Sequence, residues 1–139
     1  MILSIKITIE ELSKIGKEHK WPKNFCEGCN RNMWGHGYVS RYFATVVRSV
    51  YLKRYRCPGC GVVVVVRPEG YWSKIRNPIV TIYQTLRSKL NFGKWPEFTS
   101  RQRGGHWLNR FVSFARMELQ SNLTEFLDYC YLKQIRFLP

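Results

Sequence analysis

The sequence predicts an α+β fold, with strands in the first half of the chain and helices in the second. Up to about Gly70, apolar residues recur with a period of two or in continuous runs, and after it with a period near 3.6, as in helices. Two Cys-x-x-Cys pairs, Cys26–Cys29 and Cys57–Cys60, lie in the first part with 27 residues between them. With 139 residues, 45% of them apolar, the chain suffices for one compact unit or two very small ones.

Residues 1–23 are predicted to form a strand followed by a short helix. In residues 2–9, leucine and isoleucine alternate with polar side chains, which is typical of a half-buried strand. Residues 10–17 follow with apolar positions spaced for one inward-facing helical side. A linker that contains Pro22 then leads into the first cysteine pair.

Residues 24–70 are predicted to form a three-stranded antiparallel sheet that holds both cysteine pairs at one end. The expected strands are residues 38–50, 51–56 and 62–66, and the Gly-His-Gly of residues 35–37 is expected to form a turn. The last strand is five consecutive valines, which indicates a strand that is covered on both faces or very flat. Because exposed valines favour aggregation, we expect the N-terminal strand or a helix to cover one face.

Residues 71–139 are predicted to form a helical domain of three helices. In the first, Asn77 and Pro78 suit the N-cap and first-turn positions. Ser100 is the candidate N-cap of the second, and Ser121 or Asn122 opens the third. A Gly-Gly pair weakens the start of the second helix, which is therefore predicted to begin as late as Gly105. Two helices of which the second is basic and polar at its start resemble a helix-turn-helix, although the loop is longer than usual.

The two cysteine pairs are predicted to bind one structural Zn²⁺ ion. Tight Cys-x-x-Cys turns can bring four thiolates to one tetrahedral ion, and four sulfur ligands leave no open position for a catalytic water. Pro58, Gly59 and Gly61 favour the second turn through their backbone preferences. Two disulfides or free thiols are the alternative, and Cys130, in an apolar helical pattern, is expected to be a core residue. The predicted ligands are Cys26, Cys29, Cys57 and Cys60.

The sequence favours a cytoplasmic protein that is not an enzyme. It has no apolar run of membrane-spanning length and no secretory signal, and a reducing cytosol keeps thiolates available for metal. The one aspartate, Asp128, and the scattered glutamates do not provide the converging carboxylates of a metal-dependent nuclease. There is no glycine-rich phosphate loop, and the three histidines have no evident nucleophile partner.

The positive charge of the chain is concentrated in one segment. Residues 28–117 contain 16 Lys or Arg and two acids, Glu69 and Glu97, so this segment carries the whole net charge of +14. A localised basic field of this size indicates a polyanionic partner. The alternatives are a merely soluble basic surface and an anionic membrane, but no basic amphipathic helix with an exposed apolar face supports the membrane.

Two basic clusters are the candidate nucleic-acid contacts. In residues 53–56, strand alternation directs one pair of side chains to each face, so one pair can contact phosphates. Residues 100–106 open a helix whose free N–H groups can bind phosphate and whose Arg and Gln can reach base edges. A solvated strand face and an ordinary basic helix are the alternatives, and Trp72, Trp95 and Trp107 are interpreted as core or docking residues. The predicted contacts are Lys53, Arg54, Arg56, Arg76, Arg101, Gln102, Arg103, His106 and Arg110.

Part of the chain resembles the zinc-ribbon segment at the N-terminus of many bacterial insertion-sequence transposases and of small DNA-binding proteins associated with them. The resemblance covers residues 24–116. It depends on Cys-x-x-Cys at 26–29, Trp-Gly-His-Gly-Tyr at 34–38 and Arg-Tyr-Arg-Cys-Pro-x-Cys-Gly at 54–61. In that family a helix-turn-helix follows the second cysteine pair, and residues 79–115 are similar to it in position.

The resemblance implies recognition of double-stranded DNA during the movement of a mobile genetic element. The acidic catalytic domain of a transposase is not in this sequence, so the chain is expected to be an accessory or targeting factor, with a transposase or another DNA-processing protein as a candidate partner. An RNA-binding or ribosome-associated zinc ribbon is the second hypothesis. A transcriptional regulator, or an adaptor whose basic face contacts an acidic protein, is the third.

Overall fold

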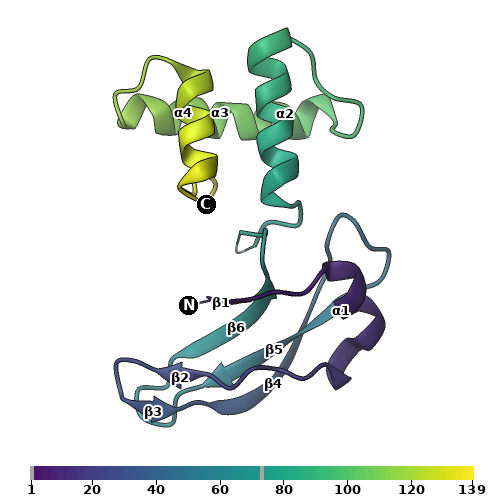
Figure 1. Cartoon of the computed structure of the whole chain (residues 1–139), viewed down its shortest axis with the longest axis vertical. Helices are drawn as coiled ribbons and strands as arrows, with labels where there is room; N and C mark the ends of the chain where they lie inside the picture. Colours follow the sequence, from purple (N-terminus) through teal and green to yellow (C-terminus); the bar gives the residue numbers. More distant parts are fainter. Residues whose placement is uncertain (1, 73) are drawn as a thin grey trace. The chain divides into compact units, whose positions relative to one another are not determined.

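The computed structural model of the chain describes residues 2–72 and 74–139, which form a mixed α+β structure (Figure 1). The chain divides into two compact units, Met1–Asn77 and Pro78–Pro139. The described strands belong to the first unit, together with one short helix, and the second unit is helical. The α+β class predicted from the change in periodicity is therefore confirmed.

Four strands of the first unit form one sheet in the order β1-β6-β5-β4, and two short strands form a separate hairpin, β2-β3. Strands β4, β5 and β6 are antiparallel neighbours, whereas β1 pairs in parallel with β6. The N-terminal strand thus lies along the edge of the valine strand and does not cover one of its faces, contrary to one expectation. The strands are β1 Ile2–Ile5, β2 Phe25–Cys26, β3 Arg31–Asn32, β4 Trp34–Arg41, β5 Val50–Arg56 and β6 Val63–Pro68.

The strand predicted over residues 2–9 is too long. It ends at Ile5, because Thr8 begins a helix: its side-chain oxygen accepts a hydrogen bond from the backbone N–H of Glu11 at 3.2 Å. Helix α1 spans Ile9–Ile15, and a 3₁₀ turn, Gly16–Glu18, continues it. The apolar alternation of the sequence therefore extends past the strand into the first buried position of α1.

The strand predicted over residues 38–50 is also wrong in its extent. Arg41 ends β4 and pairs with Val50, the first residue of β5, so residues 42–49 form the loop that joins the two strands. Residues 35–37, predicted as a turn, lie inside β4 instead. The pairing register shifts between Gly35 and Tyr38, and the backbone φ of +72° at Gly37 fits this bulge.

Both faces of the valine strand are covered, as expected from its composition. On one face, Val64 and Val66 are buried in a cluster with Met33, Tyr55 and two cysteines. On the other face, half-buried Val65 packs against a second cluster, which includes residues of α1 and β5. The members of the second cluster are Ile9, Leu12, Phe43, Val50 and Leu52. Helix α1, rather than the N-terminal strand, therefore contributes the cover on this side.

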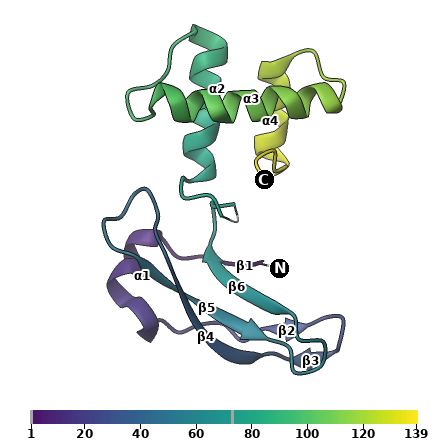
Figure 2. The same cartoon turned by 180° about the vertical axis from the view of Figure 1, so that it is seen from behind.

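The second unit consists of α2 (Ile79–Phe92), α3 (Arg101–Met117) and α4 (Leu123–Leu132). Helix α3 crosses both α2 and α4 in the two opposite views (Figures 1 and 2). The three helices bury a shared apolar core, of which the most enclosed members are Ile82, Leu86, Phe111, Ala115 and Leu127. Among the helices in the described residues, none combines the length and the apolar character needed to cross a membrane.

Helix α3 begins earlier than predicted. Its first residue is Arg101, and the side-chain oxygen of Ser100 accepts a hydrogen bond from the N–H of Arg103 at 3.2 Å, as expected of an N-cap. Gly104 does not delay the helix because it serves packing: a Cβ atom there would lie 2.6 Å from two ring carbons of Trp95. Glycine at this position thus lets the Trp95 ring pack against the helix backbone, although glycine is less favourable than alanine inside a helix.

Candidate metal centre and basic surfaces

Two turns of the first unit bring the four predicted metal ligands together. Cys26 lies in β2 of the short hairpin and Cys29 in its turn, whereas Cys57 directly follows β5. The second turn is closed by the N–H of Gly61, which donates to the carbonyl of Cys57 at 3.0 Å. The N–H of Cys57 in turn donates to the carbonyl of Val62 at 3.0 Å, which ties the turn to β6.

The sulfur positions fit a single tetrahedral metal ion. The four Sγ atoms of the paired cysteines all lie within 4.8 Å of one another. The Sγ atoms of Cys26 and Cys60 are 3.8 Å apart, and four sulfurs at about 2.3 Å from one ion are separated by about 3.8 Å in a regular tetrahedron. A disulfide requires about 2.0 Å, and all five cysteines are free. The predicted four-cysteine cluster is confirmed.

Backbone amides of the second turn favour the thiolate form of Cys57. The N–H of Cys60, and secondarily the N–H of Gly59, lower the pKa of Cys57 to about 6. The N–H of Gly59 lies 3.3 Å from the Cys57 sulfur. By contrast, hydrogen bonds with the side chains of Cys60 and Cys57 raise the pKa of Cys29 to about 12. Crowded thiols share protons in this way, and a divalent cation that replaces those protons stabilises the cluster.

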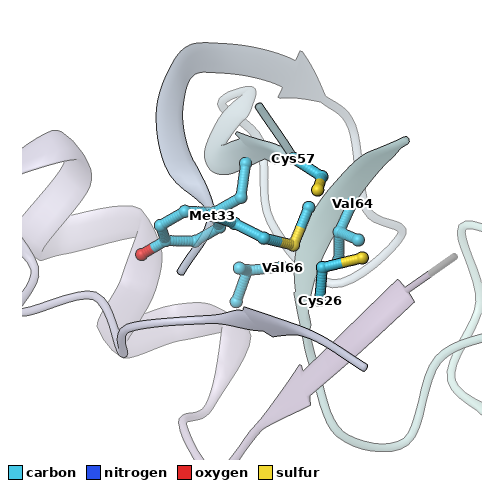
Figure 3. Packing of buried hydrophobic residues seen from close by; sticks show 6 residues of the cluster. Cys26, Met33, Cys57, Val64 and Val66 are labelled. Carbon is cyan, nitrogen blue, oxygen red and sulfur yellow. The ribbon is translucent and has the colours of Figure 1, made fainter. Parts of the chain in front are cut away.

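The cluster lies on the apolar core of the sheet. Met33, Val64 and Val66 pack beside Cys26 and Cys57, which are both buried (Figure 3). Only Cys60 among the four is exposed. Gly59 must be small as well, because a Cβ atom there would lie 3.1 Å from the sulfur of Cys29. The cluster therefore lies at the protein surface, and its buried cysteines are held by the apolar core of the sheet. Four thiolates would complete the coordination shell of a metal ion.

Cys130 does not belong to this cluster. It is buried in α4 in the second unit, and burial raises the pKa of its thiol. A thiol in apolar surroundings stays protonated and behaves as a small hydrophobic side chain. The expectation that it is a core residue is confirmed.

The basic strand residues of the first unit divide between the two faces of β5. Lys53 lies on the face of Tyr55, with its Nζ 5.4 Å from the centre of that ring. Arg54 and Arg56 lie on the opposite face, because successive side chains of a strand alternate. The Nε atom of Arg54 has no hydrogen-bond partner among the residues that the structure describes. Arg76, in the loop after β6, lies 5.9 Å over the ring of Tyr42 and is thus apart from the strand residues in the fold of this unit.

The predicted contacts of the second unit all lie on α3 and are exposed. Gln102 and His106 continue with Asn109 in one row, at spacings of four and three residues, opposite the side that buries Trp107 and Phe111. The exposed cations flank this row and the sequence of the helix contains no acidic residue. Those cations are Arg101, Arg103, Arg110 and Arg116. All five α3 residues of the prediction are therefore exposed: Gln102 and His106 lie in the row, and the three arginines lie on its two sides.

Trp34 is an exposed aromatic residue that was not among the predicted contacts. Trp34 is 67% exposed, whereas Trp72 and Trp107, taken as core residues, are 9% and 5% exposed. Trp34 is the first residue of β4 and pairs directly with Arg56 of β5. Met33, the residue before it, is buried, so the alternation of the chain at this point directs the two side chains to different environments.

Comparison of the chain with protein-family models, with curated proteins and with solved structures finds no match. The four-cysteine cluster is present in the structure but is not specific to one family. The resemblance to the zinc-ribbon segment of insertion-sequence transposases therefore stays a prediction.

Proposed function

We propose that this chain is a non-catalytic zinc-binding protein that binds double-stranded DNA through α3. The first unit is a zinc ribbon, with strands β4 to β6 and the β2-β3 hairpin around one structural Zn²⁺. The second unit is a helix-turn-helix-like domain, in which α3 is the recognition helix. Cysteines that form no disulfide fit a reducing cytoplasm, where thiolates bind metal instead of pairing.

Zinc is the ion that the donor set favours. Four sulfur ligands in a tetrahedron are typical of zinc, whereas calcium and magnesium prefer oxygen ligands. The 3.8 Å separation of two sulfurs supports the same geometry. Because four thiolates fill the shell, such a site stabilises a fold and leaves no position for a reacting water.

The observation that carries the proposal is the exposed face of α3. It combines hydrogen-bonding side chains in a central row with flanking arginines and without any carboxylate. An α-helix fits the major groove of B-DNA, where Gln pairs with adenine edges and Arg with guanine edges. With α3 in the groove, the arginines on its flanks would face the phosphates that border the groove. A helix whose partner was an acidic protein would have no need of the central row of hydrogen-bonding side chains.

The charge of each unit supports a polyanionic partner. Residues 1–77 contain 14 Lys or Arg and five acids, and residues 78–139 contain nine and four. Each unit is therefore positively charged by itself, and neutralisation of phosphates would supply much of the affinity. A role as an accessory or targeting factor of a mobile genetic element is the form of this function that the family resemblance favours, with a transposase as the candidate partner.

The test is the salt dependence of duplex binding by Arg101→Ala/Arg103→Ala. In B-DNA each lost phosphate contact lowers the slope of log K against log salt by about 0.9, so the double variant should lose affinity and up to about 2 units of slope. Lys14→Ala/Lys133→Ala is the matched control, since it removes two exposed cations outside α3. Equal effects of both variants would contradict a role for α3, and tighter binding to structured RNA than to duplex DNA would support the RNA-binding hypothesis instead.

A further inference from the structure

A shallow depression lies beside the second cysteine turn, and it has no role in the function proposed for α3. Its volume is about 510 Å³. Strand β4 and the end of β5 form one side and the turn forms the other. The lining residues are Trp34, Gly35, His36, Arg56, Cys57, Pro58, Gly59, Cys60 and Gly61.

An exposed aromatic ring and a cation meet in this depression. Trp34 and Arg56 are direct cross-strand partners in the β4-β5 ladder, so their side chains leave the sheet on the same face. Trp34 is 67% exposed and Arg56 is also exposed. Both residues belong to paired strands, so their backbones are held by the ladder rather than by a mobile loop. The half-buried imidazole of His36 completes the group.

The other lining residues keep the depression open. Three of them are glycines, and at Gly61 a φ of +75° strains any residue with a side chain. Among the described residues that line the depression, none is an aspartate or a glutamate, and its two cysteines, Cys57 and Cys60, belong to the four-cysteine cluster. The surface therefore offers a flat π system, a positive charge and little steric obstruction.

We propose that this depression binds an unpaired nucleobase of single-stranded nucleic acid, with the base stacked on Trp34 and the adjacent phosphate held by Arg56. Aromatic rings stack on bases only when those bases are not already stacked in a duplex. The neighbouring guanidinium distinguishes a nucleotide from an uncharged aromatic ligand, because the phosphate next to the base requires a cation. The depression belongs to the first unit and α3 to the second, so the two proposed sites share no residue.

The experiment uses the full, zinc-loaded chain and two fluorescent probes: an oligothymidylate of about 12 nucleotides and a blunt duplex of about 20 base pairs. Binding is followed by anisotropy at one fixed salt concentration. Loss of one stacking contact weakens binding by about fivefold or more, so Trp34→Ala should do this for the single strand and change the duplex affinity by less than about twofold. Trp34→Phe keeps a ring and should retain most of the single-strand affinity.

Two further variants keep the test decisive. Phe92→Ala removes an aromatic side chain that is 76% exposed in the other unit, and it should leave single-strand binding unchanged. Arg56→Gln removes the proposed phosphate contact without touching the indole, and it should weaken single-strand binding and lower its salt slope. Bound zinc is measured for every variant. The proposal is overturned if Trp34→Ala and Arg56→Gln bind the single strand like the parent, or if Trp34→Ala weakens both probes equally.

Discussion

Gly105→Ala should stabilise the helical unit, whereas Gly104→Ala should leave its stability unchanged or lower it. Both glycines lie in α3, and intrinsic helix propensity alone predicts that either substitution stabilises the helix by about 1 kcal/mol. The surroundings of the two positions differ. A Cβ atom at Gly104 would lie 2.6 Å from the Cε3 and Cζ3 atoms of Trp95, whereas nothing lies within 4 Å of one at Gly105.

The magnitude follows from the overlap. Carbon atoms in contact prefer about 3.5 to 4.0 Å, so the new methyl group at Gly104 would intrude by about 1 Å on a rigid, half-buried ring. Such overpacking costs about 1–3 kcal/mol, which offsets or exceeds the gain in propensity. We therefore expect Gly104→Ala to be less stable than Gly105→Ala by about 1–3 kcal/mol in the free energy of unfolding.

Urea denaturation followed by far-UV circular dichroism measures this difference, because the helical signal reports mainly on α2 to α4. A third variant tests the cause. In the background of Trp95→Ala the ring is absent, so adding Gly104→Ala should then stabilise the helix as Gly105→Ala does. Equal stability of the two single variants, or a cost at Gly104 that persists without Trp95, would refute the packing explanation.

Two other predictions concern the metal and a buried hydroxyl. Cys57→Ser should abolish the binding of one zinc ion per chain and destabilise the first unit, since structural zinc binding is folding free energy; metal analysis checks this against Cys130→Ala, which should keep the ion. Thr85→Val should destabilise the second unit by about 1–3 kcal/mol in urea denaturation, because the buried Thr99 hydroxyl, 2.8 Å from that of Thr85, loses its partner. An unchanged unfolding midpoint would contradict this role for the hydroxyl pair.

The cysteine cluster and the helices were predictable because their signals are local. Each Cys-x-x-Cys turn is specified by a few adjacent residues. Ser100 caps α3 as predicted, and Asn122, one of the two predicted candidates, caps α4. The apolar spacing of α2 likewise predicts its buried side. The solvent-facing row of α3 follows from the same helical periodicity, because the residues of the exposed side are fixed once the buried side is known.

The parts that were not predictable depend on contacts between distant residues. Nothing in residues 2–5 shows that they pair in parallel with β6, because that choice depends on which edge of the sheet is free. The bulge at Gly37 and the end of β4 at Arg41 are set by the register with β5. Gly104 was misread for the same reason: its conflict with helix propensity is explained only by the ring of Trp95.

The parallel pairing of β1 with β6 has a consequence for biosynthesis. The partners Ile2 and Val65 are roughly 60 residues apart, so at about 5–20 residues per second the earlier strand leaves the ribosome about 3–13 s before the later one. During that interval both cysteine turns are synthesised. An ion bound by the two turns would link them before β6, the partner of β1, is complete. The edge strand β1 therefore cannot pair within the sheet before β6 has been made, although it is the first strand of the sheet to be translated.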